Sequence, residues 1–172
     1  MVLIVYPVRE KRNGVAMEQA TFGAGCFWGV EAAFRQLSGV IETSVGYSGG
    51  HMLNPSYEDV CAGDTGHAEV VRVVFDPNKI TYVALLDTFW VTHDPTQIDR
   101  QGPDIGSQYR TVIFFHSQSQ KELAEASRNK LQESGRVSGV IATSIEEAED
   151  YWLAEDYHQQ FLEKRRSFVS GS

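Results

Sequence analysis

The sequence contains few cysteines, few basic residues and no long apolar run. Only two of its 172 residues are cysteine, which excludes a disulfide framework in a chain of this size and favours a reducing, cytoplasmic location. Lys and Arg number 15 against 23 Asp and Glu, so the net charge is -8 and a broad nucleic-acid-binding surface is excluded. No apolar run approaches the ~20 residues of a membrane span, so we expect neither nucleic acid nor membrane as a partner.

The N-terminal residues differ in character from the rest of the chain. A short apolar run ends at Pro7 without the preceding basic segment of a secretion signal, and charged residues follow at once. Met17 would serve equally well as a start. We therefore expect residues 1–16 to form a flexible extension and residues 17–172 to form one domain, a size that suits a single core.

Strand and helix signals alternate along the domain. Strands are predicted at 20–22, 40–47, 67–75, 109–115 and 140–145, and helices at 27–37, 82–90 and 118–134, followed by acidic helical pieces. This order is typical of an α+β domain, a ferredoxin-like split βαβ two-layer sandwich with added C-terminal helices. Two long loops, 48–66 and 93–108, are rich in Gly, Pro, Asp, Tyr and His, and we expect them to carry functional residues.

Cys26 lies between a predicted strand end and a predicted helix start, with a glycine before it. The free N–H groups and partial positive charge of a helix N-terminus favour a thiolate and predict a lowered pKa. A free cysteine is also commonly a small buried apolar residue, and position alone leaves both interpretations open. Phe27 and Trp28 cannot both face the core from one side of a helix, so one of them is expected to line a pocket.

The run Gly25-Cys26-Phe27-Trp28-Gly29 resembles the signature of the A-type methionine sulfoxide reductases. Further motifs similar to that family follow in family order from about residue 19 to 164: Gly46-Tyr47-Ser48-Gly49-Gly50, Asn54-Pro55-Ser56-Tyr57, Gly66-His67-Ala68-Glu69, His93-Asp94-Pro95-Thr96-Gln97, Arg100-Gln101-Gly102-Pro103-Asp104, Gln108-Tyr109-Arg110 and Ala154-Glu155-Asp156-Tyr157-His158-Gln159-Gln160. The resemblance implies a peptide-methionine (S)-S-oxide reductase. Such an enzyme reduces the S epimer of methionine sulfoxide, free or in oxidised proteins under repair.

The chemistry of sulfoxide reduction explains the residues that the resemblance selects. A thiolate can attack the sulfur, but the oxygen leaves only once it is protonated, so a nucleophile and a proton donor are both needed. The resemblance assigns these roles to Cys26, which becomes a sulfenic acid, and to Glu69. Glu69 opens an apolar strand, an environment that can keep a carboxyl neutral near pH 7, although residue type alone favours a solvated carboxylate there.

The remaining site residues are also assigned by the resemblance. It implies that the hydroxyls of Tyr57 and Tyr109 hold the sulfoxide oxygen and that Asp104 acts near that oxygen through water. It further implies that Phe27 and Trp28 form an apolar pocket for the S-methyl group. Without the resemblance, Asp104 also fits a turn-former, and the four aromatic residues fit core packing.

Recycling of the enzyme requires a second thiol, because a sulfenic acid at Cys26 must be resolved. Many family members carry resolving cysteines in a glycine-rich C-terminal tail, whereas residues 161–172 contain none. The chain is then truncated, or Cys61 resolves Cys26, or an external thiol does so. We expect a one-cysteine mechanism with no bound cofactor, with thioredoxin, glutaredoxin or glutathione as reductant (dithiothreitol in vitro) and Cys61 a buried bystander.

Three other functions fit part of the pattern. A Cys-His hydrolase or acyl transferase would need His67 or His93 oriented against Cys26. A binding module would recognise oxidised methionine without turnover, and a thiol peroxidase would also form a sulfenic acid. A metal site is not expected, because His67, His93 and His158 lack the spacing of helical ligand pairs.

Overall fold

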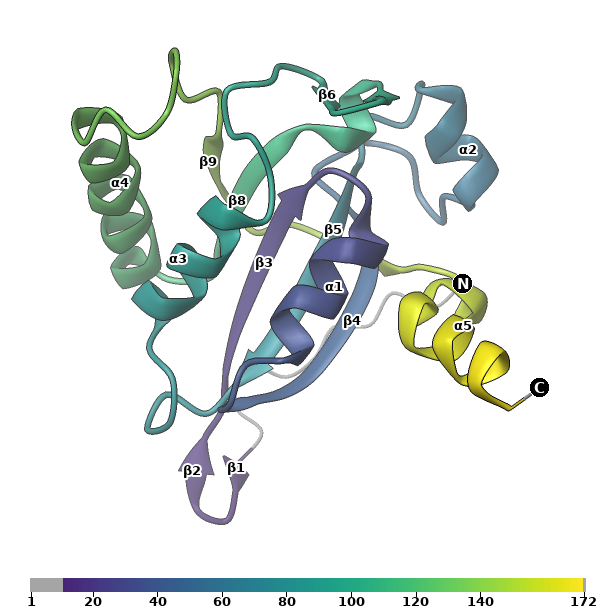
Figure 1. Ribbon diagram of the computed structural model, residues 1–172, viewed down its shortest axis with the longest axis horizontal. Coiled ribbons are helices and arrows are strands. Elements are labelled where there is room, and N and C mark those ends of the chain that lie inside the picture. The colour runs from purple at the N-terminus through teal and green to yellow at the C-terminus, as the bar shows by residue number, and fades with distance from the viewer. Residues whose placement is uncertain (1–10, 172) are drawn as a thin grey trace.

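The computed structural model describes residues 11–171, so the first ten residues of the predicted extension lie outside the described chain. It shows a mixed α/β fold in which helices pack on a curved six-stranded sheet (Figure 1). The strand order is β10-β4-β5-β3-β8-β9. All neighbours in this sheet are antiparallel except β8 and β9, which are parallel. Within residues 11–171, no helix combines the length and apolar character needed to cross a membrane.

The strands of the main sheet are β3 (Glu18–Ala24), β4 (Val40–Ser48), β5 (Ala68–Phe75), β8 (Thr111–Phe115), β9 (Ser144–Glu147) and β10 (Tyr151–Leu153). Two small hairpins stand apart from it, β1–β2 (Lys11–Arg12 and Val15–Ala16) and β6–β7 (Arg100–Gln101 and Asp104–Ile105). The helices are α1 (Phe27–Arg35), α2 (Tyr57–Ala62), α3 (Tyr82–Val91), α4 (Gln118–Glu133) and α5 (Phe161–Ser170), with short 3-10 turns η1 (Ser107–Tyr109) and η2 (Asp156–His158). Thr81 caps the start of α3, because its side chain accepts the N–H of Ala84.

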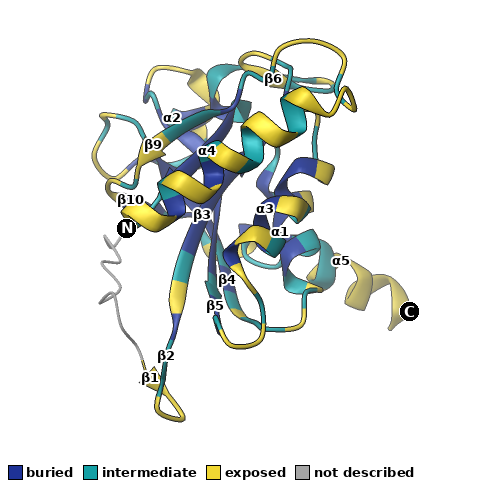
Figure 2. Ribbon diagram, turned by 90° about the vertical axis from the view of Figure 1, so that its left-hand side faces the viewer, coloured by how far each residue is buried: buried dark blue, intermediate teal, exposed yellow. Residues whose placement is uncertain are grey.

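The main core lies between the sheet and helices α1, α3 and α4. Phe22 of β3 stacks against Phe34 of α1 and Phe89 of α3, with ring centroids 5.1 and 5.2 Å apart. Figure 2 shows this interior as buried, whereas the outer surface of α4 is exposed. Strand side chains alternate between faces, so Val71 and Val73 of β5 enter this core while Val70 faces the other side of the sheet. The same alternation puts Glu69 on the helix side, close to the start of α1.

Two predicted strands differ from the observed ones. The strand expected from residue 109 begins at Thr111, because Tyr109 belongs to η1, which follows Gly106 at a φ of 143°. The strand expected over 140–145 is β9, at 144–147. Strand signals are local, whereas the ends of these strands are set by pairing with β3 and β8.

Several short elements were missed by sequence reasoning, among them α2 and β10. The loop expected over 48–66 contains α2, whose start carries a capping box between Ser56 and Asp59, a signal that the sequence does display. The acidic stretch expected to be helical after residue 145 contains the edge strand β10, which pairs with β4. Three residues are too few to show the alternation of apolar and polar side chains that identifies a strand, so β10 can be recognised only from its pairing with β4.

Candidate active site

Cys26 lies at the junction between β3 and α1, where it is the residue immediately before the helix. Gly25 precedes it with a φ of 87°, a conformation that favours glycine. A Cβ atom on Gly25 would lie 2.8 Å from the side chain of Gln101, so the β6–β7 hairpin covers this turn closely. Glycine is therefore required at position 25 both by the backbone conformation and by packing.

The Cys26 thiol is half-buried at the N-terminus of α1. Burial, with smaller contributions from the Glu69 and Asp104 carboxyls, raises its pKa to about 11, although hydrogen bonds from the backbone N–H groups of Trp28 and Gly29 lower it. The predicted lowering of the pKa is therefore wrong for the resting site. The helix N-terminus acts in the expected direction, but desolvation outweighs it, so Cys26 rests as a thiol.

Glu69 is only 2% exposed, and its Oε2 accepts the backbone N–H of Phe27 at 3.1 Å. Burial raises the pKa of this carboxyl to about 8; the Phe27 N–H lowers it and Asp104 raises it. At pH 7 the side chain is therefore mostly protonated. This agrees with the expected neutral carboxyl and places an acidic proton beside Cys26.

Three further predicted residues converge here from separate segments. Tyr57 is the first residue of α2, Asp104 begins β7 and Tyr109 ends η1. Burial raises the pKa of Tyr109 to about 12, with the neighbouring Glu69, Asp104 and Cys26 among the further causes. Burial and a hydrogen bond with Cys61 raise the pKa of Tyr57. Both tyrosine hydroxyls therefore remain neutral hydrogen-bond donors near pH 7.

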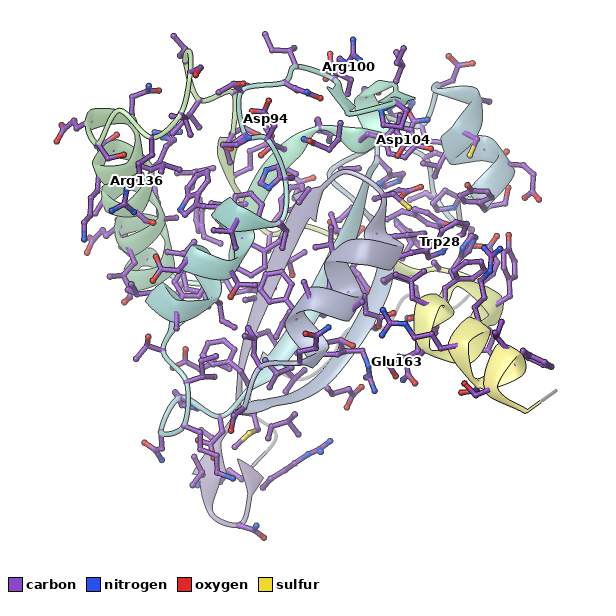
Figure 3. All side chains as sticks on the ribbon, viewed as in Figure 1. Trp28, Asp94, Arg100, Asp104, Arg136 and Glu163 are labelled. Carbon is purple, nitrogen blue, oxygen red and sulfur yellow. The ribbon has the colours of Figure 1, made fainter. Side chains whose placement is uncertain are left out.

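The two aromatic residues after Cys26 have different surroundings. Phe27 is 1% exposed and its ring packs against Tyr47 and His158. Trp28 is partly exposed. Its indole stacks on Phe161 with ring centroids 3.9 Å apart, and its Nε1–H donates a hydrogen bond to Nδ1 of His158 at 2.9 Å. Figure 3 shows Trp28 and Asp104 on the same side of the molecule, although they are far apart in the sequence. Trp28 is therefore the aromatic residue that is accessible at the surface.

His158 supports this arrangement, and sequence reasoning considered it only as a metal ligand. It is fully buried among the rings of Phe27, Trp28 and Tyr57. An indole N–H can only donate, so Nδ1 accepts and the neutral ring carries its proton on Nε2, which has no hydrogen-bond partner within residues 11–171. Burial lowers the pKa of the imidazole. The one sequence signal for this role was the position of His158 inside a family-like motif.

The ring nitrogens of His67 and His93 are engaged by groups other than Cys26. The Nδ1 atom of His67 accepts a hydrogen bond from the N–H of Gly50, and its Nε2 hydrogen-bonds with the carbonyl of Met52. The ring nitrogens of His93 form hydrogen bonds with the carbonyl of Phe89 and the hydroxyl of Thr111. These contacts argue against the Cys-His hydrolase alternative. Residues 11–171 contain no group of three or more His, Cys, Asp or Glu arranged to bind a metal.

Cys61 lies near the end of α2 and is exposed, so the expectation that it is buried was wrong. Only Val60 of this short helix is buried, and the next residue faces solvent. The thiol nevertheless contacts the site through its hydrogen bond with the Tyr57 hydroxyl. Both cysteines are free thiols.

Comparison with known proteins gives consistent matches over most of the chain. The family model described as peptide methionine sulfoxide reductase matches residues 18–170. Peptide methionine sulfoxide reductase MsrA of Methanothermobacter thermautotrophicus is 62% identical over 147 residues, which cover 86% of this chain and 87% of that protein.

Solved structures also match this fold. Methionine sulfoxide reductase A of Corynebacterium diphtheriae aligns with a TM-score of 0.77 and 40% identity, covering 87% of this chain and 76% of that one. Reduced Mxr1 of Saccharomyces cerevisiae aligns with a TM-score of 0.83 and 34% identity, and the alignment covers 92% of this chain and 90% of Mxr1. Mxr1 has also been solved in complex with Trx2. Together with the family model and the sequence relatives, these matches show that the chain belongs to the peptide methionine sulfoxide reductase family.

Proposed function

We propose that this protein reduces the S epimer of methionine sulfoxide, free or in proteins, to methionine and thereby repairs oxidised proteins. The observation that carries the proposal is the buried Glu69 carboxyl beside Cys26, where it accepts the backbone N–H of the next residue, Phe27, and where burial raises its pKa. The overall reaction transfers the oxygen: Cys26–SH and a sulfoxide give Cys26–SOH and a thioether. The substrate sulfur gains two electrons and the cysteine sulfur loses two.

Glu69 and Cys26 supply the protons and the electron pair. Glu69 protonates the sulfoxide oxygen, and the positive charge that develops on the substrate favours the Cys26 thiolate, which the Trp28 and Gly29 N–H groups stabilise. The thiolate forms an S–S bond as the oxygen leaves as water with the protons of Glu69 and Cys26. Water then attacks the Cys26 sulfur, methionine departs with the S–S electron pair, and the released proton returns to Glu69.

The remaining site residues orient the sulfoxide. The hydroxyls of Tyr57 and Tyr109 donate to the oxygen, and Asp104 acts through water. Trp28 contacts the S-methyl group, with Phe27 behind it. Fixing the oxygen, the methyl group and the line of attack at the same time defines the handedness of the sulfur, which explains selection of the S epimer.

An external thiol regenerates the enzyme in this proposal. A thiol attacks the Cys26 sulfenic acid, releases water and forms a mixed disulfide, which a second thiol reduces. Thioredoxin, glutaredoxin or glutathione can serve, with dithiothreitol in vitro, and the complex of Mxr1 with Trx2 supports a thioredoxin-like partner. No bound cofactor takes part, and Cys61 remains a thiol.

Turnover of separated sulfoxide epimers tests the function. With dithiothreitol, the protein should produce methionine from the S epimer and little from the R epimer. Cys26→Ser should abolish this activity, while the matched variant Cys61→Ser should keep it. Binding without turnover would instead favour a recognition module, and faster reduction of hydrogen peroxide than of sulfoxide would favour a peroxidase.

The fate of the two thiols tests the recycling route. After a single turnover without reductant, intact mass measurement should show one dimedone adduct, at Cys26, and a free thiol at Cys61. A protein two hydrogens lighter, with both thiols lost and no adduct, would show a Cys26–Cys61 disulfide and contradict the one-cysteine mechanism.

We also propose the finer fold description, a ferredoxin-like split βαβ sandwich. The inner strand order β4-β5-β3-β8, with α1 and α3 as crossovers, supports it. Residues 17–172 then form the catalytic domain. The β1–β2 hairpin projects below the sheet in Figure 1, which supports treating residues 11–16 as part of an extension.

A further inference from the structure

The segment after β10 contacts the site through a side chain that the proposed reaction does not use. Glu155 lies between β10 and η2. Its Oε1 accepts the hydroxyl of Tyr47 at 3.0 Å, and its Oε2 accepts the backbone N–H of Tyr57 at 3.0 Å. One carboxylate therefore joins the main sheet to the first residue of α2, across about 100 residues of sequence in each case.

The contact with Tyr57 fixes the start of α2. The first N–H groups of a helix cannot be accepted within the helix itself. The Ser56 side chain accepts the N–H of Asp59, and Glu155 accepts that of Tyr57. Glu155 thus holds the backbone that carries the Tyr57 side chain, whose hydroxyl interacts with Cys61 by a hydrogen bond and with Glu69 electrostatically.

The contact with Tyr47 fixes Glu155 in turn. Tyr47 is fully buried, pairs with Glu69 across β4 and β5, and packs its ring against Phe27. Burial, together with the neighbouring Glu155, raises the pKa of the Tyr47 hydroxyl, which therefore remains a donor. A buried donor needs an acceptor, and Glu155 supplies it. The carboxylate is held in place by the same part of the sheet that carries Glu69.

We propose that Glu155 is a positioning residue for sulfoxide reduction, which sets the location of the Tyr57 hydroxyl relative to Glu69. This inference rests on the proposed role of Tyr57 in holding the sulfoxide oxygen. Glu155 acts through Tyr57 and does not contact the substrate, because both of its carboxylate oxygens are engaged by Tyr57 and Tyr47.

Substitutions at Glu155 separate hydrogen bonding from charge. Glu155→Ala leaves two donors without an acceptor and should slow single-turnover methionine formation by about 10-fold to 100-fold, the cost of a misplaced site. Glu155→Gln should restore most of the rate, because its amide oxygen still accepts the backbone N–H of Tyr57, the contact that positions α2, although its amide nitrogen cannot accept the Tyr47 hydroxyl. Asp156→Ala, which removes a neighbouring exposed carboxylate, is the matched control and should match wild type.

A double-mutant cycle with Tyr57→Phe distinguishes positioning from general stability. In that background the hydroxyl is already absent, so adding Glu155→Ala should change the rate by less than about twofold. Equal losses in both backgrounds would overturn the inference and leave Glu155 merely structural. If Tyr57→Phe alone is as fast as wild type, the role of Tyr57 and this inference both fail, while wild-type turnover still supports the reductase activity.

Discussion

Two glutamates among residues 11–171 are almost completely buried, and they differ in how many hydrogen-bond donors surround them. Glu31 of α1 is 1% exposed and Glu69 of β5 is 2% exposed. Glu31 accepts the N–H of Gln160 at 2.6 Å and the hydroxyl of Thr43 at 2.9 Å. Glu69 accepts one hydrogen bond from the described chain, the N–H of Phe27.

The difference in donors explains the difference in role. Burial raises the pKa of both carboxyls, but two hydrogen bonds and the nearby Arg35 lower that of Glu31. The pKa of Glu69 is lowered only by the hydrogen bond from the Phe27 N–H, so burial and the nearby Asp104 raise it to about 8. A buried carboxyl with enough donors ties elements together, whereas one with too few carries a proton.

The largest expected effect separates the two carboxyls by chemistry. Glu69→Gln keeps the shape but cannot deliver a proton, so single-turnover methionine formation should fall by roughly 10²-fold or more. Glu31→Gln, the matched change at the other buried site, should stay within about threefold of wild type. Equal rates for Glu69→Gln and wild type would make Glu69 structural, and another donor would be needed.

The raised pKa of Glu69 should also make the stability of the protein depend on pH. Because folding raises the pKa of Glu69 from about 4.5 to about 8, the folded state binds more protons than the unfolded state in this range. Wild type should therefore lose stability relative to Glu69→Gln as pH rises from about 4.5 to about 8, by up to about 1.4 kcal/mol per pH unit. Urea unfolding across this range measures it. Parallel stability curves for the two proteins would contradict the raised pKa.

Removal of Glu31 should affect folding rather than chemistry. Glu31→Ala leaves the Gln160 N–H and the Thr43 hydroxyl without their acceptor, so the free energy of unfolding should fall by about 2–4 kcal/mol. The single-turnover rate per folded molecule, measured well below the melting temperature, should change less than about threefold. A large rate loss at unchanged stability would make Glu31 part of the site.

The smallest expected effect concerns the aromatic side, where no proton moves. Trp28→Phe keeps an aromatic ring near Phe161 but loses the N–H donated to His158, an interaction of about 1 kcal/mol. We expect KM to rise about fivefold with kcat nearly unchanged, in contrast to Glu69→Gln. Trp28→Ala should go further and reduce the preference for the S epimer. An unchanged preference in that variant would assign Trp28 to packing alone.

Local sequence patterns predicted the elements that local interactions stabilise. The strands β3, β4 and β5 and the helix α3, capped by Thr81, follow from alternation and helical spacing. The strand β10 did not follow, because it exists through pairing with β4. The site residues themselves came from their resemblance to a family, and the structure gathers them from five separate segments.

Two features of the site depend on the fold and were therefore not predictable locally. The helix N-terminus at Cys26 correctly predicted N–H groups near the sulfur, but the burial that raises the thiol pKa comes from the surrounding segments. Glu155 and His158 act on Tyr57 and Trp28, about 100 and 130 residues away in the sequence. No pattern within one segment reveals such contacts.

The protonation state of Glu69 is the central claim, and difference infrared spectroscopy measures it directly. Wild type should show a protonated carboxyl C=O band near pH 7 that is absent from Glu69→Gln, persists in Glu31→Gln, and disappears as pH rises through about 8. A wild-type spectrum without this band at pH 7, or a band that titrates near the ordinary glutamate value of about 4.3, would contradict the account.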